Sequence, residues 1–282
     1  MENFINTINS IVWSNFLVGL FLVAGVYFSI RTGFVQVRQV KEMSGLAINR
    51  KKSEKGISSF QALSVSLAGR IGTGNIAGVG TAIALGGPGA IFWMWIIAFL
   101  GAGTAFVEST LGQLYKVEED GQYRGGPAYY IEKGLGKKEF GILFAMATLI
   151  AMGLLLPGVQ ANSIANSMNT AFGLESNIVG ILLIVILGGI IFGGIKRIGV
   201  VAELIVPFMG LAYIIMALLI ILFNLDKLPG VFMLIIRSAF GAEQAFAGII
   251  GLTVSWGVKR GVYSNEAGRG TGPQSAAAAE AN

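Results

Sequence analysis

Residues 69–80 read Gly-Arg-Ile-Gly-Thr-Gly-Asn-Ile-Ala-Gly-Val-Gly. This stretch lies in the middle of residues 58–85, an apolar run long enough to cross a bilayer. Five of its twelve residues are glycine, and each glycine inside a helix costs about 1 kcal/mol relative to alanine. The pattern therefore predicts a helix that is interrupted at membrane depth, where irregular backbone survives only if it lines a cavity or is buried in protein.

An interrupted helix offers backbone groups to a ligand. Amides at the start of the second half attract a carboxylate, and carbonyls at the end of the first half attract a cation. Close packing of small residues is the alternative explanation; it accounts for Gly78 and Gly80 but leaves Arg70 and Asn75 unexplained. A dinucleotide-binding loop is rejected, because the spacing is G-x-G-x-x-x-G and neither a preceding strand nor a suitably placed acidic residue is present.

A second apolar run, residues 244–270, becomes polar and rich in glycine in the same way. Its residues 253–270 read TVSWGVKRGVYSNEAGRG. A pair of interrupted spans indicates a transporter binding site, and we expect the two segments, with Gly74 and Trp256, to lie close together near the bilayer midplane. The alternative is that residues 259–273 form a loop.

The composition indicates an all-α membrane protein. Hydrophobic residues make up 54% of the 282 residues and charged residues only 12%, about half the share in soluble proteins. The mean hydropathy is +0.71. Residues 228–240 are too short to cross and are expected at the interface, and Pro207 is expected to kink its helix. The seven expected spans are residues 4–30, 58–85, 90–115, 140–165, 178–195, 198–223 and the irregular 244–270.

The basic residues predict the orientation. Fourteen of the 20 Lys and Arg residues lie in 31–57, 116–139 and 196–197, which we therefore place in the cytoplasm, with the N-terminus outside. Residues 166–177 contain no Lys or Arg, as expected of an outside loop. A cleaved signal peptide is rejected, since no basic residue precedes the first apolar run and no cleavage site follows it. This placement of the +5 net charge also argues against nucleic acid as a partner.

Several chemistries are excluded by composition. The chain has no cysteine and no histidine, which removes disulfides, thiol nucleophiles, Ser-His-Asp triads and the usual zinc sites. No span carries paired carboxylates, so we expect no enzyme activity and no cofactor. A channel is disfavoured because no charged ring or carbonyl filter motif is evident.

Some polar residues outside the two segments have two explanations each. Arg70 and Glu108 are ionisable groups within spans, which usually mark function, although Glu108 would also suit the cytoplasmic interface. Glu203 is expected near a helix start, where a carboxylate suits the helix dipole. Gln160 and Asn162 follow Pro157-Gly158 and either face a substrate or cap their helix.

Three linked motifs resemble the alanine or glycine:cation symporter family over nearly the whole chain. They are IGTGNIAGVGTAIALGGPGAIFWMW, GGPAYYIEKGLG and WGVKRGVYSNEAGRGTGPQSAAAA. The resemblance implies a leucine-transporter type of fold, with five helices repeated in inverted orientation. It also implies symport of a small neutral amino acid such as alanine or glycine with sodium, or with protons, across the plasma membrane. Glutamine carriers resemble the same pattern, so the substrate stays open.

The resemblance also implies a site. The break at Gly72–Asn75 would hold the amino acid, with the amides of Thr73 and Gly74 on its carboxylate. Carbonyls before the break, such as those of Ala68 and Ile71, would help to hold the coupling cation. Trp256 and its neighbours would close the other side. The full expected set of substrate-binding residues is Gly72, Thr73, Gly74, Asn75, Gln160, Thr253, Ser255, Trp256 and Gly257.

The expected organisation is the first half of the five-plus-five repeat. Residues 1–30 would be an extra helix, 31–57 a basic loop, 58–224 the first repeat and 225–282 the start of the second. Since the family's chain continues through the second repeat, the sequence looks like an N-terminal fragment, which we expect not to catalyse coupled transport alone. The sequence gives no indication of oligomeric state.

Overall fold

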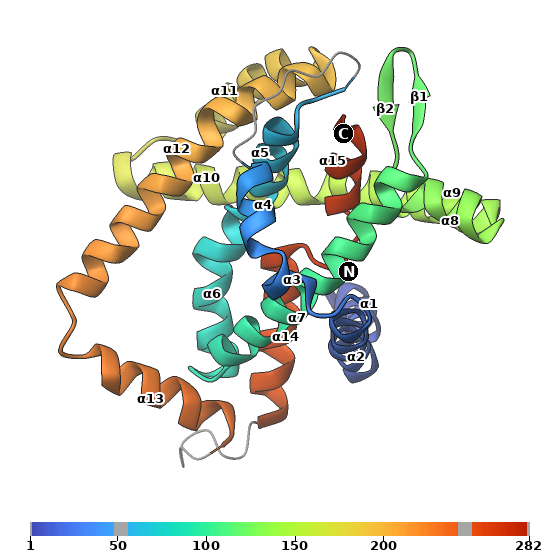
Figure 1. The fold of residues 1–282 in the computed structure, drawn as a ribbon. Helices are drawn as coiled ribbons and strands as arrows, with labels where there is room; N and C mark the ends of the chain where they lie inside the picture. The colour runs from blue at the N-terminus through green and yellow to red at the C-terminus, as the bar shows by residue number, and fades with distance from the viewer. Residues whose placement is uncertain (1, 48–55, 242–249, 281–282) are drawn as a thin grey trace. The chain divides into compact units, whose positions relative to one another are not determined.

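The computed structural model describes residues 2–47, 56–241 and 250–280, and it is almost entirely helical (Figure 1). Basic residues 50–52 and 55 of the predicted cytoplasmic loop lie outside the described residues. In chain order the elements are α1 Glu2–Val12, α2 Asn15–Arg31, α3 Val35–Arg38, α4 Val40–Ala47, α5 Ser59–Arg70, α6 Thr73–Gly86, α7 Ala90–Leu114, β1 Val117–Glu119, β2 Gln122–Arg124, α8 Pro127–Leu135, α9 Lys138–Thr148, a π-helix Leu149–Leu155, α10 Leu156–Phe172, α11 Ser176–Ile191, α12 Gly194–Leu222, α13 Leu228–Ala239, α14 Ile250–Asn265 and α15 Gly272–Ala278.

The chain divides into two compact units. Unit 1 comprises Met1–Met43, Gly74–Val107 and Gly210–Arg269, and unit 2 comprises Ser44–Thr73, Glu108–Met209 and Gly270–Asn282. Both interrupted segments pass from one unit to the other at their breaks, so that α6 and α14 belong to unit 1 whereas α5 and α15 belong to unit 2.

The predicted interruption of the first segment is confirmed. α5 begins with a capping box, in which the Ser58 hydroxyl accepts from the Gln61 amide and the Gln61 side chain accepts from the Ser58 amide. It ends at Arg70, Ile71 and Gly72 are not helical, and α6 starts at Thr73.

The second break lies further along the chain than the sequence predicted. α14 is a continuous helix through Gly257 and Gly261, and the irregular backbone is confined to residues 266–271. The two glycines pack closely inside the helix: a Cβ on Gly257 would lie 2.6 Å from the Ala90 carbonyl, and one on Gly261 would collide with Ile97. The helix ends where Glu266, Gly268 and Gly270 adopt positive φ. The expectation that irregular backbone begins near Thr253 is therefore wrong.

Four described helical segments are long and apolar enough to cross a membrane: Thr7–Arg31, Ala90–Leu114, Lys138–Phe172 and Gly194–Leu222. The third is longer than the predicted span 140–165, because α9, the π-helix and α10 are continuous. Most of the predicted outside loop 166–177 is therefore helical. α10 ends at Phe172, and Gly173, with φ of 69°, caps it. α11 has 16 residues and α13 has 12. α12 continues through Pro207 without a break.

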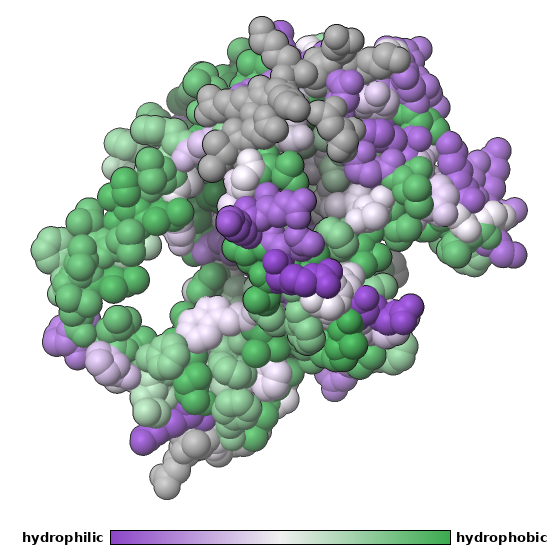
Figure 2. All heavy atoms as spheres, in the orientation of Figure 1, coloured by the Kyte–Doolittle hydropathy of each residue, from purple (hydrophilic) through white to green (hydrophobic). Residues whose placement is uncertain are grey.

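Large apolar side chains cover the outside of these helices. In Figure 2 the surface over α12 is predominantly apolar. Leu204, Phe208 and Phe223 are 78%, 76% and 83% exposed. Such a surface is typical of helices that contact lipid.

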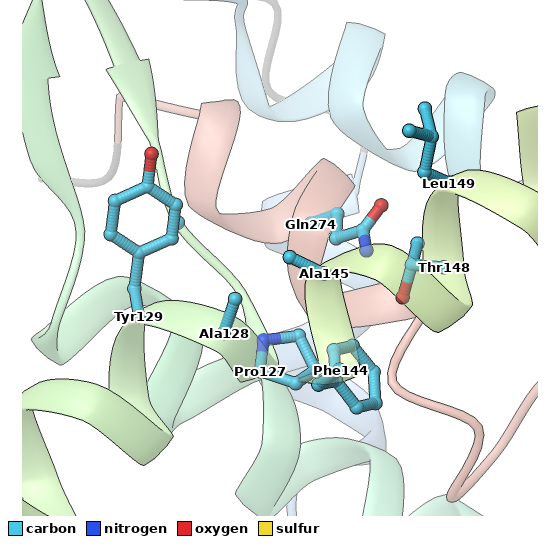
Figure 3. A pocket seen from close by; sticks show the side chains of 9 residues that line it. Pro127, Ala128, Tyr129, Phe144, Ala145, Thr148, Leu149 and Gln274 are labelled. Carbon is cyan, nitrogen blue, oxygen red and sulfur yellow. The ribbon is translucent and has the colours of Figure 1, made fainter. Parts of the chain in front are cut away.

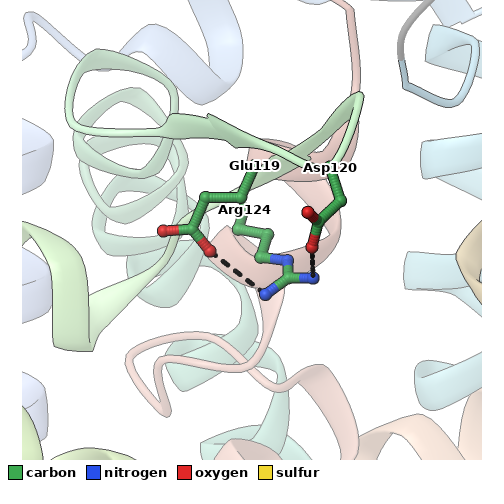
Figure 4. Close-up of polar contacts among 3 residues, drawn as sticks. All are labelled: Glu119, Asp120 and Arg124. Carbon is green, nitrogen blue, oxygen red and sulfur yellow. Dashed lines mark hydrogen bonds and ion pairs between the residues drawn. The ribbon is translucent and has the colours of Figure 1, made fainter.

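The predicted loop 116–139 contains regular structure. β1 and β2 form an antiparallel hairpin with Val117 opposite Arg124, and α8 follows. The turn is Asp120-Gly121, with φ of 53° and 70°, so the Asp-Gly pair was a hairpin signal that the sequence analysis did not use. Arg124 forms ion pairs with Glu119 at 3.1 Å and Asp120 at 3.3 Å (Figure 4).

In unit 1, α6 and α14 pack antiparallel. The start of α6 at Gly74 lies against Tyr263 and Ser264 near the end of α14, and Gly86 at the end of α6 lies against Leu252 and Trp256. α2 and α7 pack on α14 through a core formed by Val18, Ile97, Val258 and Val262.

In unit 2, α5 and α15 are also antiparallel. Arg70 at the end of α5 lies near Gly272 at the start of α15, and Ile57, just before α5, hydrogen-bonds to the end of α15. Ile57, Ala62, Ala278 and Ala279 form the core of this pair. Each half-helix of the first segment thus packs on a half-helix of the second within its own unit. The expectation that Gly74 and Trp256 lie close together is wrong, because Gly74 meets Tyr263 and Ser264 while Trp256 meets Gly86 at the other end of α6.

Candidate substrate site at the interrupted helices

Gln160 of α10 lies at the first break. Its Oε1 accepts a hydrogen bond from the Thr73 amide at 3.4 Å and another from the Thr73 hydroxyl. A Cβ on Gly72 would lie 3.2 Å from Gln160 Nε2. Of the two explanations that the sequence left open, the structure supports a place at the break, because Gln160 caps the start of α6 rather than its own helix.

The start of α6 has the electrostatics of an anion site. The first four amides of a helix have no acceptor within the helix, and the helix dipole adds partial positive charge there. Gln160 supplies an acceptor to Thr73, the first of the four. Gly72, Thr73, Gly74 and Asn75 therefore present the kind of backbone that a carboxylate requires.

The end of α5 has the opposite polarity. Ala68 lies in its last turn and Ile71 directly follows it. The carbonyls at the end of a helix have no amide donor within the helix. The Ile71 amide uses the Leu67 carbonyl at 2.7 Å. Arg70 lies in the same turn, and its guanidinium is 3.7 Å from where a Cβ on Gly272 would lie. A cation at Ala68 and Ile71 would therefore be bound by backbone oxygens beside a fixed positive charge.

The end of α14 faces the start of α6. A Cβ on Gly74 would lie 3.0 Å from Tyr263 Cδ1 and 3.3 Å from Ser264 Cα. Ser264 is only 2% exposed, and its hydroxyl has no hydrogen-bond partner among the described residues. A buried polar atom without a partner is costly and requires an explanation, such as a ligand. Sequence reasoning did not select Tyr263 and Ser264; the antiparallel pairing of the two helices is what brings them to Gly74.

The residues selected from the second segment lie at the other end of the α6–α14 pair. The buried Thr253 hydroxyl donates to the Gly86 carbonyl at 2.6 Å, and a Cβ on Gly86 would lie 2.8 Å from Trp256 Cβ. Gly257 packs on α7, and the Trp256 ring has Lys259 and Arg260 on its face at 5.8 and 5.4 Å.

Ser255 is buried and lines a separate cavity of about 720 Å³ beside Asn15 of α2. Twelve residues separate Gly74 from Gly86, or about 18 Å of helix. The structure therefore does not bring Thr253, Ser255, Trp256 and Gly257 to the break.

Two carboxylates outside the break have identifiable surroundings. Burial, followed by the negative charge of Glu108, raises the pKa of Tyr130 to about 12. Tyr130 belongs to α8 in the basic loop, which favours the interfacial explanation of Glu108. Glu203 accepts from Gln61 Nε2 at 3.0 Å. It is the tenth residue of α12, so it lies further from the helix start than expected.

A further cavity of unit 2, about 270 Å³, lies between α8, α9 and Gln274 of α15 (Figure 3). Its lining is mainly apolar, and it contains none of the residues predicted for the site. Within residues 2–47, 56–241 and 250–280, no three acidic side chains gather as a metal site.

Comparison with known sequences identifies relatives over the whole chain. The model of the sodium:alanine symporter family matches residues 1–282. The carrier protein YrbD of Bacillus subtilis (strain 168) is 60% identical over 280 residues, covering 99% of this chain and 58% of YrbD. GlnT of the same organism, named as a probable sodium/glutamine symporter, is 47% identical over 284 residues, covering 99% of the chain and 59% of GlnT. The sodium/alanine symporter AgcS of Methanococcus maripaludis is 43% identical over 284 residues, covering 98% and 63%. The chain thus spans about three fifths of the length of these curated relatives.

Proposed function

Because the chain belongs to the sodium:alanine symporter family, we propose that it forms the substrate-binding part of a secondary transporter. The family is one of transporters rather than enzymes, and together with the apolar helices it identifies a multi-pass membrane protein. The proposed reaction is symport of a small neutral amino acid, alanine or glycine, with sodium across the plasma membrane. Protons are the alternative coupling ion. The proposed topology is the first half of a five-plus-five inverted repeat, with the N-terminus outside.

The observation that carries the proposal is the start of α6. Gln160 reaches it from another helix and accepts from both the amide and the hydroxyl of Thr73. In the proposed mechanism, the break at Gly72–Asn75 holds the amino acid. The Gly74 amide binds the substrate carboxylate, and Gln160 accepts from the neighbouring Thr73 amide and so fixes the start of the helix. The carbonyls of Ala68 and Ile71 contribute to the sodium site. No cofactor takes part.

The side chain of the substrate would meet Tyr263 and Ser264, which lie against Gly74. An aromatic ring at van der Waals distance favours a small substrate. Glutamine is the second candidate because GlnT, at 47% identity, carries that name.

The test is binding of labelled alanine to the purified chain in detergent, measured in sodium chloride and in choline chloride. Sodium-dependent binding that unlabelled alanine and glycine displace is the expected result. Displacement by glutamine at lower concentration than alanine would favour the second candidate. Binding that ignores sodium would contradict sodium coupling, and the same assay over a pH series at constant sodium would then test protons.

Uptake into vesicles that contain the complete carrier distinguishes a transporter from the other classes of protein. A symporter accumulates labelled alanine against its gradient when sodium is high outside. A channel conducts without accumulating solute, and an enzyme alters the substrate chemically.

A further inference from the structure

Side chains from the end of α7 hold the end of α15. Gln113 Nε2 donates to the carbonyls of Ala276 and, at 3.2 Å, Ala279. Lys116 Nζ donates to the Ala279 carbonyl at 2.9 Å and to Gln113 Oε1 at 2.7 Å. The last carbonyls of a helix lack donors within the helix and carry partial negative charge, so an ammonium group suits this position.

Three glycines shape the surface on which α15 rests. A Cβ on Gly112 would lie 2.7 Å from the Pro273 carbonyl, and one on Gly125 would lie 2.7 Å from Ala277 Cβ. A Cβ on Gly56 would collide with the Ala278 carbonyl. Ala277 is fully buried. α15 is therefore seated closely, in a position that Gln113 and Lys116 then fix.

Lys116 occupies a partly desolvated position. Its ammonium lies 4.1 Å from the centre of the Tyr123 ring in β2. Desolvation lowers its pKa, and the charge of Glu280 opposes that effect. The ammonium group is thus positioned jointly by the Ala279 carbonyl, Gln113 Oε1 and the Tyr123 ring.

The start of α5 is tied to the same place. The Ile57 amide donates to the Ala278 carbonyl, and the Glu280 amide donates to the Ile57 carbonyl, both at 3.1 Å. Ile57 is fully buried and packs with Ala62, Ala278 and Ala279. A movement that frees α15 from α7 would therefore carry α5 with it.

We propose that Lys116 and Gln113 form a latch that holds the α5–α15 pair against the end of α7. As positioning residues they do not touch the substrate. When Lys116 and Gln113 release the end of α15, α5 and α15 move together. The assignment of this movement to a transport cycle rests on the proposed function. In the alternative, α5 moves without α15. That movement would break the hydrogen bonds between Ile57 and the end of α15.

The absence of cysteine from the sequence permits a direct test on the chain itself. Single cysteines replace Ala278 in α15 or Ala62 in α5, both buried, and the rate of maleimide labelling is measured in membranes. Lys116→Met is expected to raise the rate at both positions by about tenfold, equivalent to about 1.4 kcal/mol. Lys116→Arg, which keeps the charge and donors, and Lys133→Met, at an exposed lysine of α8, are expected to stay within about twofold of the parent.

Each result has a defined consequence. Unchanged rates in Lys116→Met would overturn the latch. An increase at Ala278 alone would overturn the joint movement of α5 and α15. A cysteine at Ala165, buried in α10, is the control for general loosening. An equal increase there would show that Lys116 supports overall stability and not a latch.

Sodium and alanine provide a readout that a merely structural role would not change. In the parent they are expected to alter the labelling rate at Ala278, whereas in Lys116→Met the rate should no longer respond. A chain that binds alanine without this response would overturn the release step. A chain that fails to bind alanine at all would instead contradict the proposed function, while the comparison of Lys116→Met with Lys116→Arg still tests the latch.

Discussion

The two pairs of half-helices, α6–α14 and α5–α15, are held together by different interactions. α6 and α14 meet through glycine: Gly74 contacts Tyr263, and Gly86 contacts Trp256. α5 and α15 meet through backbone hydrogen bonds at Ile57, and Lys116 and Gln113 fix the end of α15. The first pair should therefore be sensitive to added volume, and the second to lost polar groups.

The largest expected effect is a steric one on the first pair. Gly86→Val adds a side chain where a Cβ would already lie 2.8 Å from Trp256 Cβ. We expect a loss of about 1–3 kcal/mol in the free energy of unfolding, typical of overpacking. Resistance to unfolding in mixed micelles with increasing denaturing detergent measures it.

Gly80→Ala is the matched control in the same helix. Among the residues that the structure describes, nothing lies within 4 Å of a Cβ on Gly80, so alanine should stabilise α6 by about 0.5–1 kcal/mol. Equal destabilisation by both variants would show that helix propensity, and not the contact between α6 and α14, dominates.

Gln160→Leu tests the polar cap at the start of α6. It removes the acceptor of both Thr73 donors while keeping the volume similar. Leaving the partly buried Thr73 donors without their acceptor would disturb the start of α6, so sodium-dependent alanine binding should weaken by about tenfold, equivalent to about 1.4 kcal/mol. Equilibrium binding of labelled alanine provides the measurement.

Gln160→Glu is the control, because it retains an acceptor but adds a negative charge near the proposed carboxylate position. It should restore the cap yet bind alanine less well than the parent. If both variants bind alanine as the parent does, Gln160 and the start of α6 are not part of the substrate site.

Thr253→Val sharpens the distinction between the two ends of the α6–α14 pair. It removes the hydrogen bond to the Gly86 carbonyl and should cost about 1 kcal/mol of stability. Alanine affinity should not change, since Thr253 lies about 18 Å from Gly74 along α6. A loss of alanine affinity without a loss of stability would show that Thr253 belongs to the substrate site.

The smallest effect is expected at the hairpin beside the second pair. Arg124→Ala removes ion pairs to Glu119 and Asp120 whose side chains are about half exposed or more. Exposed pairs contribute little, so the free energy of unfolding should change by less than about 1 kcal/mol. A larger loss in the same detergent titration would mean that the hairpin stabilises α15 through these charges.

Local signals in the sequence determined much of the architecture. The glycine-rich stretch 69–80 predicted the first interruption. The break falls at Ile71 and Gly72, whereas Gly74, Gly78 and Gly80 lie inside α6. The length of the apolar runs predicted the four spans Thr7–Arg31, Ala90–Leu114, Lys138–Phe172 and Gly194–Leu222, because a helix must be long and apolar to cross a bilayer. The three motifs identified the family, which the family match then established. The Asp120-Gly121 pair was also a local signal, because this dipeptide is typical of the turn of a β-hairpin.

Only the tertiary structure decided which residues meet. Glycine either interrupts a helix or lets another helix approach, and the neighbour determines which. Gly257 and Gly261 therefore looked like a break until α7 was found against them. The antiparallel register of α6 and α14 places Tyr263 and Ser264, rather than Trp256, beside Gly74. Contacts between residues 74 and 263, or 116 and 279, join positions distant in sequence, so no local pattern of residues encodes them.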